Sequence, residues 1–215
     1  MKILALDSSS SMASVAMVDY SDLENSTSLL YHYHQTHERT NSSALFEGLE
    51  KAVQIAGKPD FMVVGIGPGS YNGLRVSIAA AQGMASALGV RLRGMPSVLA
   101  IDQEAPHYWI AGDARGGKYW LASVTNHHFA QEPVLLSPEN IPEFLLARPD
   151  LPLFAATSLP KIPDSPKITI AYPCAIALAR LSQDPSYKED SLTPLYLKEA
   201  HVTMPSVPIF QKNGN

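Results

Sequence analysis

The sequence has little charge, and its small excess is acidic. Lysine and arginine total 16 against 20 aspartate and glutamate residues, which gives a net charge of −4 over 215 residues. A protein that grips nucleic acid by itself needs a basic surplus to meet the phosphates. The composition therefore excludes an autonomous nucleic-acid-binding module. Any role on RNA requires a partner that supplies positive surface.

Cysteine and long apolar runs are also scarce. The single cysteine, Cys174, excludes an internal disulfide and a thiolate metal cluster, and we expect it to be a buried apolar residue on a helix. No run approaches the roughly 18 apolar residues that a membrane span needs. The N-terminal run "ILAL" ends at Asp7 and is too short for a signal peptide. We therefore expect a soluble, cytoplasmic protein without membrane contact.

The apolar pattern of the first half predicts a mixed sheet with helices packed on it. Helices are indicated by an apolar stripe at helical spacing over 41–57, ended by Gly57, and by an alanine-rich segment over 73–88, closed by Gly89. Pro96 starts a third predicted helix over 96–103. Strands are expected over 2–6, 14–19, 29–35, 61–67 and 90–94. The order β-β-β-α-β-α-β-α indicates the α/β class.

The second half is richer in proline, and we expect it to be more broken by loops. A hairpin with the turn "DARGG" is predicted over 108–125. Further strands are expected over 151–157 and 168–173, a helix over 174–182, and an extended segment over 191–205. Because each half begins with a hairpin, we predict an N-terminal lobe over 1–104 and a C-terminal lobe over 105–215. The C-terminal segment can pack back on the first lobe.

The stretch "GIGPGSYNGLR" (65–75) has the position of a phosphate-binding loop, between a buried strand and a helix. It lacks the lysine and hydroxyl residue of a Walker A motif and does not match G-x-G-x-x-G. Asp7, at the end of the first strand, could orient a metal-bound phosphate or close an Asx-type turn. The candidate phosphate or nucleotide residues are Asp7, Ser8, Gly67, Gly69 and Ser70.

Other catalytic signals are weak. His32 and His34 share one face of a strand, and His37 follows, but no carboxylate spacing supports a metal site, and a solvated strand face is the better interpretation. No G-x-S-x-G elbow is present. A nucleotide-binding shape without a catalytic base or metal set favours a non-catalytic role, with no catalytic residue and no metal ligand assigned.

The alanine-rich helix supplies a different indication. Its many small side chains permit close approach by another helix, and it can lie beside the helix at 41–57. If both leave apolar surface exposed, two copies or two related chains could form a four-helix bundle; the alternative is packing on the chain's own sheet. The residues that we expect at such an interface are Leu45, Leu49, Val53, Leu74, Ile78, Ala81 and Ala85.

Four segments resemble the TsaB (YeaZ-like) family of tRNA threonylcarbamoyladenosine biosynthesis proteins. They are "ILALDSSSSMASVAMVD", "VVGIGPGSYNGLRVSIAAAQGMASALGVRLRGMPSVLA", "DARGGKYW" and "PLYLK". The second, in which the G-P-G-S loop runs into the helix, is the most specific. The resemblance implies the actin-like fold of sugar kinases and chaperone ATPases, with two lobes of related topology.

The resemblance also implies a function. TsaB-like chains are non-catalytic partners of TsaD, which transfers a threonylcarbamoyl group to the adenosine beside the anticodon in tRNAs that read codons starting with A. TsaD has an H-x-x-x-H metal motif, which is not found here. The family contacts TsaD through its two N-lobe helices, forms a homodimer when alone, and is joined by the ATPase TsaE. No cofactor is required, and weak ATP or ADP binding in the complex stays open.

A different class of function also stays open at this point. The chain could be a small ATPase or phosphotransferase of the actin-like fold that uses Asp7 and the loop at 67–70. A metallopeptidase, suggested by the old naming of related proteins as glycoproteases, lacks a metal motif in this sequence.

Overall fold

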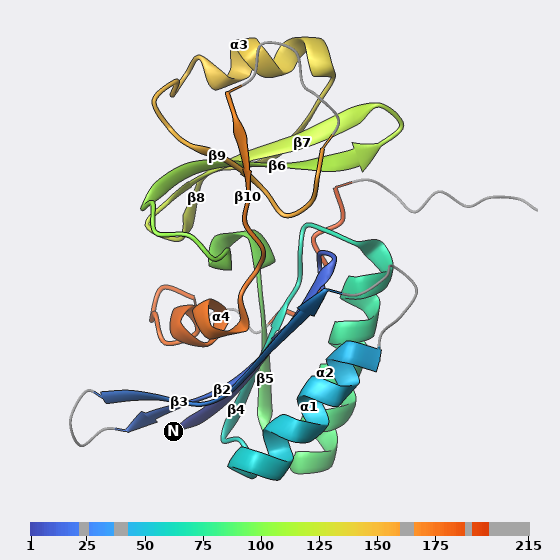
Figure 1. Ribbon diagram of the computed structural model, residues 1–215, viewed down its shortest axis with the longest axis vertical. Helices are drawn as coiled ribbons and strands as arrows, with labels where there is room; N and C mark the ends of the chain where they lie inside the picture. The colour runs from blue at the N-terminus through green and yellow to red at the C-terminus, as the bar shows by residue number, and fades with distance from the viewer. Residues whose placement is uncertain (22–25, 37–42, 160–165, 188–190, 198–215) are drawn as a thin grey trace, which may run out of the picture.

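The computed structural model describes residues 1–21, 26–36, 43–159, 166–187 and 191–197. It consists of two five-stranded sheets that lie one above the other along the long axis of the molecule (Figure 1). Helices cover both faces of the lower, N-terminal sheet, and a short helix lies on the far side of the upper, C-terminal sheet.

The N-terminal sheet has the strand order β3-β2-β1-β4-β5. Its strands are β1 (Lys2–Asp7), β2 (Met12–Ser21), β3 (Ser26–Thr36), β4 (Phe61–Gly65) and β5 (Arg91–Met95). β1 and β4 are apolar and buried along most of their length, as central strands with both faces covered must be. β1 pairs antiparallel with β2 and parallel with β4, so the carboxyl ends of β1 and β4 lie side by side.

Two long helices cover one face of this sheet, namely α1 (Ser43–Ala56) and α2 (Tyr71–Leu88). Gly57 and Gly89 follow them in left-handed conformations, with φ of 78° and 64°, which glycine adopts without steric cost. Both helix ends are therefore confirmed. The expected cap at Asn41 and Ser42 lies outside the described residues.

The C-terminal sheet has the order β10-β9-β6-β7-β8. Its strands are β6 (His107–Arg115), β7 (Lys118–Thr125), β8 (His128–Leu136), β9 (Leu153–Ala155) and β10 (Ile168–Ile170). The 3-10 turn η2 (Pro138–Asn140) and the helix α3 (Ile141–Leu145) connect β8 to β9. Side chains of α3 pack with Trp109 and Leu121 on one face of the sheet.

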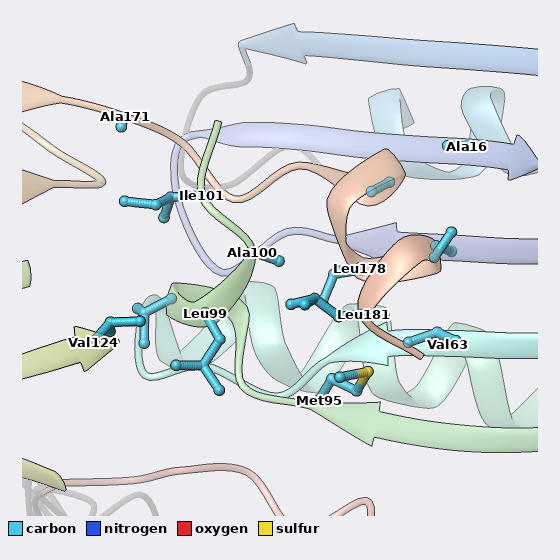
Figure 2. Packing of buried hydrophobic residues seen from close by; sticks show 14 of the residues in the cluster. Ala16, Val63, Met95, Leu99, Ala100, Ile101, Val124, Ala171, Leu178 and Leu181 are labelled. Atoms are coloured by element: carbon cyan, nitrogen blue, oxygen red, sulfur yellow. The ribbon is translucent and has the colours of Figure 1, made fainter. Parts of the chain in front are cut away.

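The joint between the sheets is apolar. The 3-10 turn η1 (Ser97–Ala100) leads to Ile101, which bridges Pro173. α4 (Ala175–Leu181) then packs on the N-terminal sheet, on the face opposite to α1 and α2. Figure 2 shows Leu178 and Leu181 of this helix directed toward the sheet. One cluster of buried residues therefore runs through both lobes.

The last described segment also returns to the N-terminal lobe. The backbone N–H of Leu195 donates to the carbonyl of Ile66 (2.8 Å), and Leu192 and Leu195 pack against the core beneath α1 and α2. At Gly94 a Cβ would come within 2.2 Å of the Ser191 carbonyl oxygen. Only glycine admits the returning backbone so close to β5.

Three predictions of secondary structure need correction. The helix expected over 96–103 is only the single turn η1, because Ile101 takes an extended conformation (ψ 150°) and leads the chain toward the second sheet. The strand β8 and the short helix α3 lie where no element was predicted. α2 begins at Tyr71, two residues before its predicted start.

The two sheets share one topology. In each, the first three strands form an antiparallel meander, and the fourth and fifth add in parallel beside the first. This duplication confirms the predicted α/β, actin-like fold with two related lobes. None of the described helices is long and apolar enough to cross a membrane.

Candidate functional site

The structure brings the predicted phosphate residues together at one edge of the N-terminal sheet. The turn that starts with Asp7 follows β1, and the loop that contains Gly67, Gly69 and Ser70 follows β4. Since β1 and β4 are parallel neighbours, both loops leave the sheet at the same end. The loop then enters α2, whose first turn is capped by Ser70; its Oγ accepts from the Gly73 N–H (3.4 Å).

These two loops interlock. The Ser70 N–H donates to the Ser9 carbonyl, and the Ser8 hydroxyl donates to the Gly73 carbonyl (2.9 Å). A Cβ on Gly69 would come within 2.2 Å of the Ser9 oxygen, and one on Gly73 within 1.9 Å of the Ser8 oxygen. The glycines therefore allow the two loops to pack closely against each other. The Ser70 N–H, a donor that could otherwise face an anion, is already bonded to the Ser9 carbonyl.

Asp7 is fully buried beneath this junction. Its Oδ1 accepts from the N–H (2.8 Å) and hydroxyl (2.7 Å) of Ser9, which is an Asx-type turn. Its Oδ2 has no hydrogen-bond partner among the described residues and lies under Gly65, where a Cβ would come within 1.7 Å of it.

Burial raises the pKa of Asp7, while the nearby Ser97 hydroxyl and the hydrogen bonds from Ser9 act in the opposite direction. The raised pKa favours the neutral carboxyl group. Such a group suits a structural turn better than a metal ligand, because metal binding requires the ionised carboxylate.

The side chains predicted at a partner interface lie inside the chain instead. Leu45, Leu49, Ile78, Ala81 and Ala85 belong to the core between the helices and the sheet, and each is no more than 7% exposed. Leu74 is completely buried and Val53 is partly buried. A contact of these side chains with a partner stays a prediction. Their helical stripe packs on the chain's own sheet, which offers a large apolar face.

Other residues form the outer surface of the two helices. On α2, residues three and four positions apart form an exposed stripe in which all side chains but that of Gln82 are short, here called the small-residue stripe: Ala79, Gln82, Gly83, Ser86 and Ala87. A Cβ on Gly83 would meet nothing within 4 Å. On α1, Phe46 and Ile55 are 50% and 64% exposed. The helix pair thus has a partly apolar outer surface, carried by residues that the sequence analysis did not select.

An aromatic cluster lies at the start of α2. Tyr71 and Tyr196 are 5.0 Å apart between ring centroids, and the Arg75 guanidinium lies 5.3 Å from the Tyr71 ring. This cluster was not predicted from the sequence. Tyr71 and Arg75 have i,i+4 spacing, which is a readable signal. Tyr196 comes from the returning segment, whose position the sequence does not reveal.

The histidines are only partly solvated. His34 is exposed, but His32 is half-buried and its Nε2 has no hydrogen-bond partner among the described residues. Burial lowers the pKa of His32, and His34 lowers it further, whereas Asp102 raises it. His37 lies outside the described residues. Within the described part of the chain, no three His, Cys, Asp or Glu side chains are grouped to hold a metal ion.

Cys174 is partly buried directly before α4, and burial raises the pKa of its thiol. A raised pKa disfavours the reactive thiolate. The expectation of a buried residue on a helix is met only in part, because Cys174 is half-buried and precedes α4.

Comparison with protein families matches residues 32–108 to the model of TsaD, tRNA N6-adenosine threonylcarbamoyltransferase. This segment contains α1, the glycine-rich loop and α2. A search of curated proteins finds no match.

Two solved structures share the fold. One is an uncharacterized protein with similarity to peptidase YeaZ from Pseudomonas aeruginosa, with 22% identity, a TM-score of 0.71, and coverage of 92% of this chain and 99% of that chain. The other is YeaZ from Pseudomonas aeruginosa, with 21% identity, a TM-score of 0.70, and coverage of 91% and 99%. The resemblance to the TsaB (YeaZ-like) family is confirmed by this shared fold together with the TsaD match.

Proposed function

We propose that this chain is a non-catalytic subunit of a cytoplasmic tRNA threonylcarbamoylation complex. It holds a TsaD-like catalytic chain against the outer surface of α1 and α2, and TsaE joins the assembly that results. When alone, the chain forms a homodimer through the same surface. tRNA is reached only through the complex, as the acidic net charge of −4 favours.

Gly83 is the observation that carries this proposal. A glycine inside a helix costs roughly 0.5–1 kcal/mol relative to alanine. Nothing in the described chain repays this cost, because a Cβ at this position would meet no atom within 4 Å. A partner helix that packs closely on α2 would explain it, since close helix packing needs short side chains at the contact.

The surroundings of Gly83 suit such a contact. The small-residue stripe places short side chains about one turn to either side of it, at Ala79 and at Ser86 and Ala87. The exposed rings and chains of Phe46 and Ile55 on α1 add apolar area. Two antiparallel helices from a related chain would bury the small-residue stripe on α2 and the exposed apolar side chains on α1. Together with α1 and α2 they would form a four-helix bundle.

The junction at Asp7 favours a subunit without chemistry of its own. The turn after β1 and the loop after β4 bond to each other, and the carboxyl group of Asp7 is buried beneath them. A phosphotransferase of this fold would instead need an ionised carboxylate and free backbone donors facing a phosphate.

Reconstitution with purified TsaD, TsaE and substrate tRNA tests the proposal. We expect tRNA modification to require this chain, and the Ala79→Arg variant to lose both co-elution with TsaD and self-association. Ala130→Arg, the same change at an exposed position of β8, should retain both. Far-UV circular dichroism of the two variants checks that they fold.

Two outcomes would contradict the proposal. One is unchanged association of Ala79→Arg with TsaD. The other is ATP turnover by the purified chain that Asp7→Asn abolishes, which would support the phosphotransferase instead.

A further inference from the structure

A polar cavity lies on the opposite side of the N-terminal sheet from α1 and α2. Its volume is about 350 Å³, near the lower end of the range of about 300–1,000 Å³ for small-molecule sites. Three segments that are distant in sequence form its walls: the linker between the lobes, the turn between β7 and β8, and the last turn of α4. Its polar lining consists of Gln103, Glu104, Asn126, His127 and Arg180.

Arg180 supplies an uncommitted positive charge. Its exposed guanidinium makes no hydrogen bond or ion pair with the described residues. It is not needed to cap α4, because the Ser182 N–H donates to the Leu178 carbonyl and the Ser182 hydroxyl to the Ala179 carbonyl. A guanidinium in a cavity is a ready partner for a carboxylate, which it can bind through two parallel hydrogen bonds.

Hydrogen-bond acceptors line the same cavity. The Nδ1 of His127 lies 3.1 Å from the Leu99 carbonyl, and because a carbonyl only accepts, Nδ1 carries the proton and leaves Nε2 as an acceptor in the neutral ring. The Oε1 of Gln103 is buried beneath the cavity surface without a partner among the described residues, so it is not open to a ligand. Glu104 is exposed and makes no ion pair within the described part of the chain.

The cavity wall is held by contacts on its outer side. The Tyr187 hydroxyl donates to the His127 carbonyl, and the Tyr187 ring stacks on His128 with centroids 4.9 Å apart. The His128 Nε2 lies 3.6 Å from the Asp184 carboxylate. These contacts join the β7–β8 turn to the segment that follows α4, so two of the cavity walls are linked directly.

We propose that this cavity binds a small zwitterion of the amino-acid class. Arg180 receives the carboxylate of the ligand, and Glu104 and His127 accept from its ammonium group. One cation beside several acceptors matches a ligand that carries both charges better than a simple anion or a simple cation. The site is independent of the proposed partner surface, which lies on the other face of the sheet (Figure 1).

The test titrates the 15N-labelled full chain with three probes and follows amide shifts by NMR. Glycine carries both charges, acetate only the negative one, and methylammonium only the positive one. We expect saturable shifts around residues 103–106, 126–127 and 180 with glycine, and at least about tenfold weaker binding of the other two, because a hydrogen bond to a charged group is worth about one such factor.

Variants then locate the site. Arg180→Gln and Glu104→Gln should each weaken glycine binding at least about tenfold. Arg148→Gln, at another exposed arginine beside α3, should leave it unchanged. The proposal is overturned if glycine gives no saturable shifts, if acetate binds as tightly as glycine, or if Arg180→Gln binds glycine like the parent chain.

Discussion

The two lobes have the same strand order but differ in what covers their sheets. Helices of 14 and 18 residues lie on the N-terminal sheet, whereas the helix on the C-terminal sheet has 5 residues. One face of the C-terminal sheet packs on α3, and the other packs into the joint between the lobes. In the N-terminal lobe, the long helices use one side for the sheet and present the other to solvent.

This difference in helix length indicates where a partner surface can form in a fold with two related lobes. A helix of four or five turns can bury one side on the sheet and still present a continuous second side to solvent, whereas the 5 residues of α3 make little more than one turn. The segment that matches the TsaD family, residues 32–108, contains the two long helices. The N-terminal lobe therefore presents two long helices to solvent, whereas the described part of the C-terminal lobe presents only the short α3 on its sheet.

The largest expected effect is a difference in stability between substitutions on the buried and on the exposed side of α1. Leu45 is 1% exposed and its neighbour Phe46 is 50% exposed. Leu45→Ala removes a buried side chain and leaves a cavity, so we expect a loss of about 3 kcal/mol in the free energy of unfolding. Phe46→Ala should change it by less than about 0.5 kcal/mol. Urea unfolding followed by circular dichroism measures both, and equal losses would contradict the assignment of the two sides.

The next effect concerns the interlocked turns at the start of α2. In Gly73→Ala the new methyl group would lie 1.9 Å from the Ser8 carbonyl oxygen, and the backbone on both sides must move. We expect a loss of about 2 kcal/mol, within the usual cost of overpacking. The measurement is again urea unfolding. A stability equal to that of the parent chain would show that the two turns are not held against each other.

Much of the N-terminal lobe could be predicted because its patterns are long and regular. The helix over 73–88 has an apolar stripe and a terminal Gly89, and both signals were correct. β8 could not be predicted, since it is an edge strand with mixed burial and contains Pro133. An edge strand tolerates proline because one side of its backbone needs no ladder partner. The five residues of α3 are too few to show a helical period.

The candidate site was predicted in part. The approach of Asp7 to the loop at 67–70 follows from two parallel strands, and the sequence indicated both loops. The surface that the helical stripe packs against could not be predicted, because an apolar stripe such as Leu45 and Leu49 shows that one side of a helix is buried, but not against what. Gly83 and Ala79 were visible in the sequence, yet their exposure depends on which side of α2 faces the sheet.

A third prediction concerns the pH dependence that Asp7 imposes. Because burial raises its pKa in the folded state, the folded chain binds more protons than the unfolded chain between the two pKa values. The free energy of unfolding therefore falls as pH rises from the unfolded value near 3.9 through the folded one. Asp7→Asn should remove this part of the slope, which urea unfolding at several pH values measures. A slope that persists unchanged would assign the dependence to other groups.

The smallest expected effect concerns the outer side of α2, where one substitution should raise the stability of the monomer but lower its affinity for a partner. Gly83→Ala adds a methyl group where the described chain has no atom within 4 Å, so the free energy of unfolding of the monomer should rise by about 1 kcal/mol. The same methyl group lies where a partner helix would pack, so the affinity for TsaD and for a second copy should fall. Thermal unfolding at low protein concentration and sedimentation equilibrium separate the two quantities. If stability rises while both affinities stay the same, the glycine is not part of a helix contact, and the partner surface must lie elsewhere than on α2.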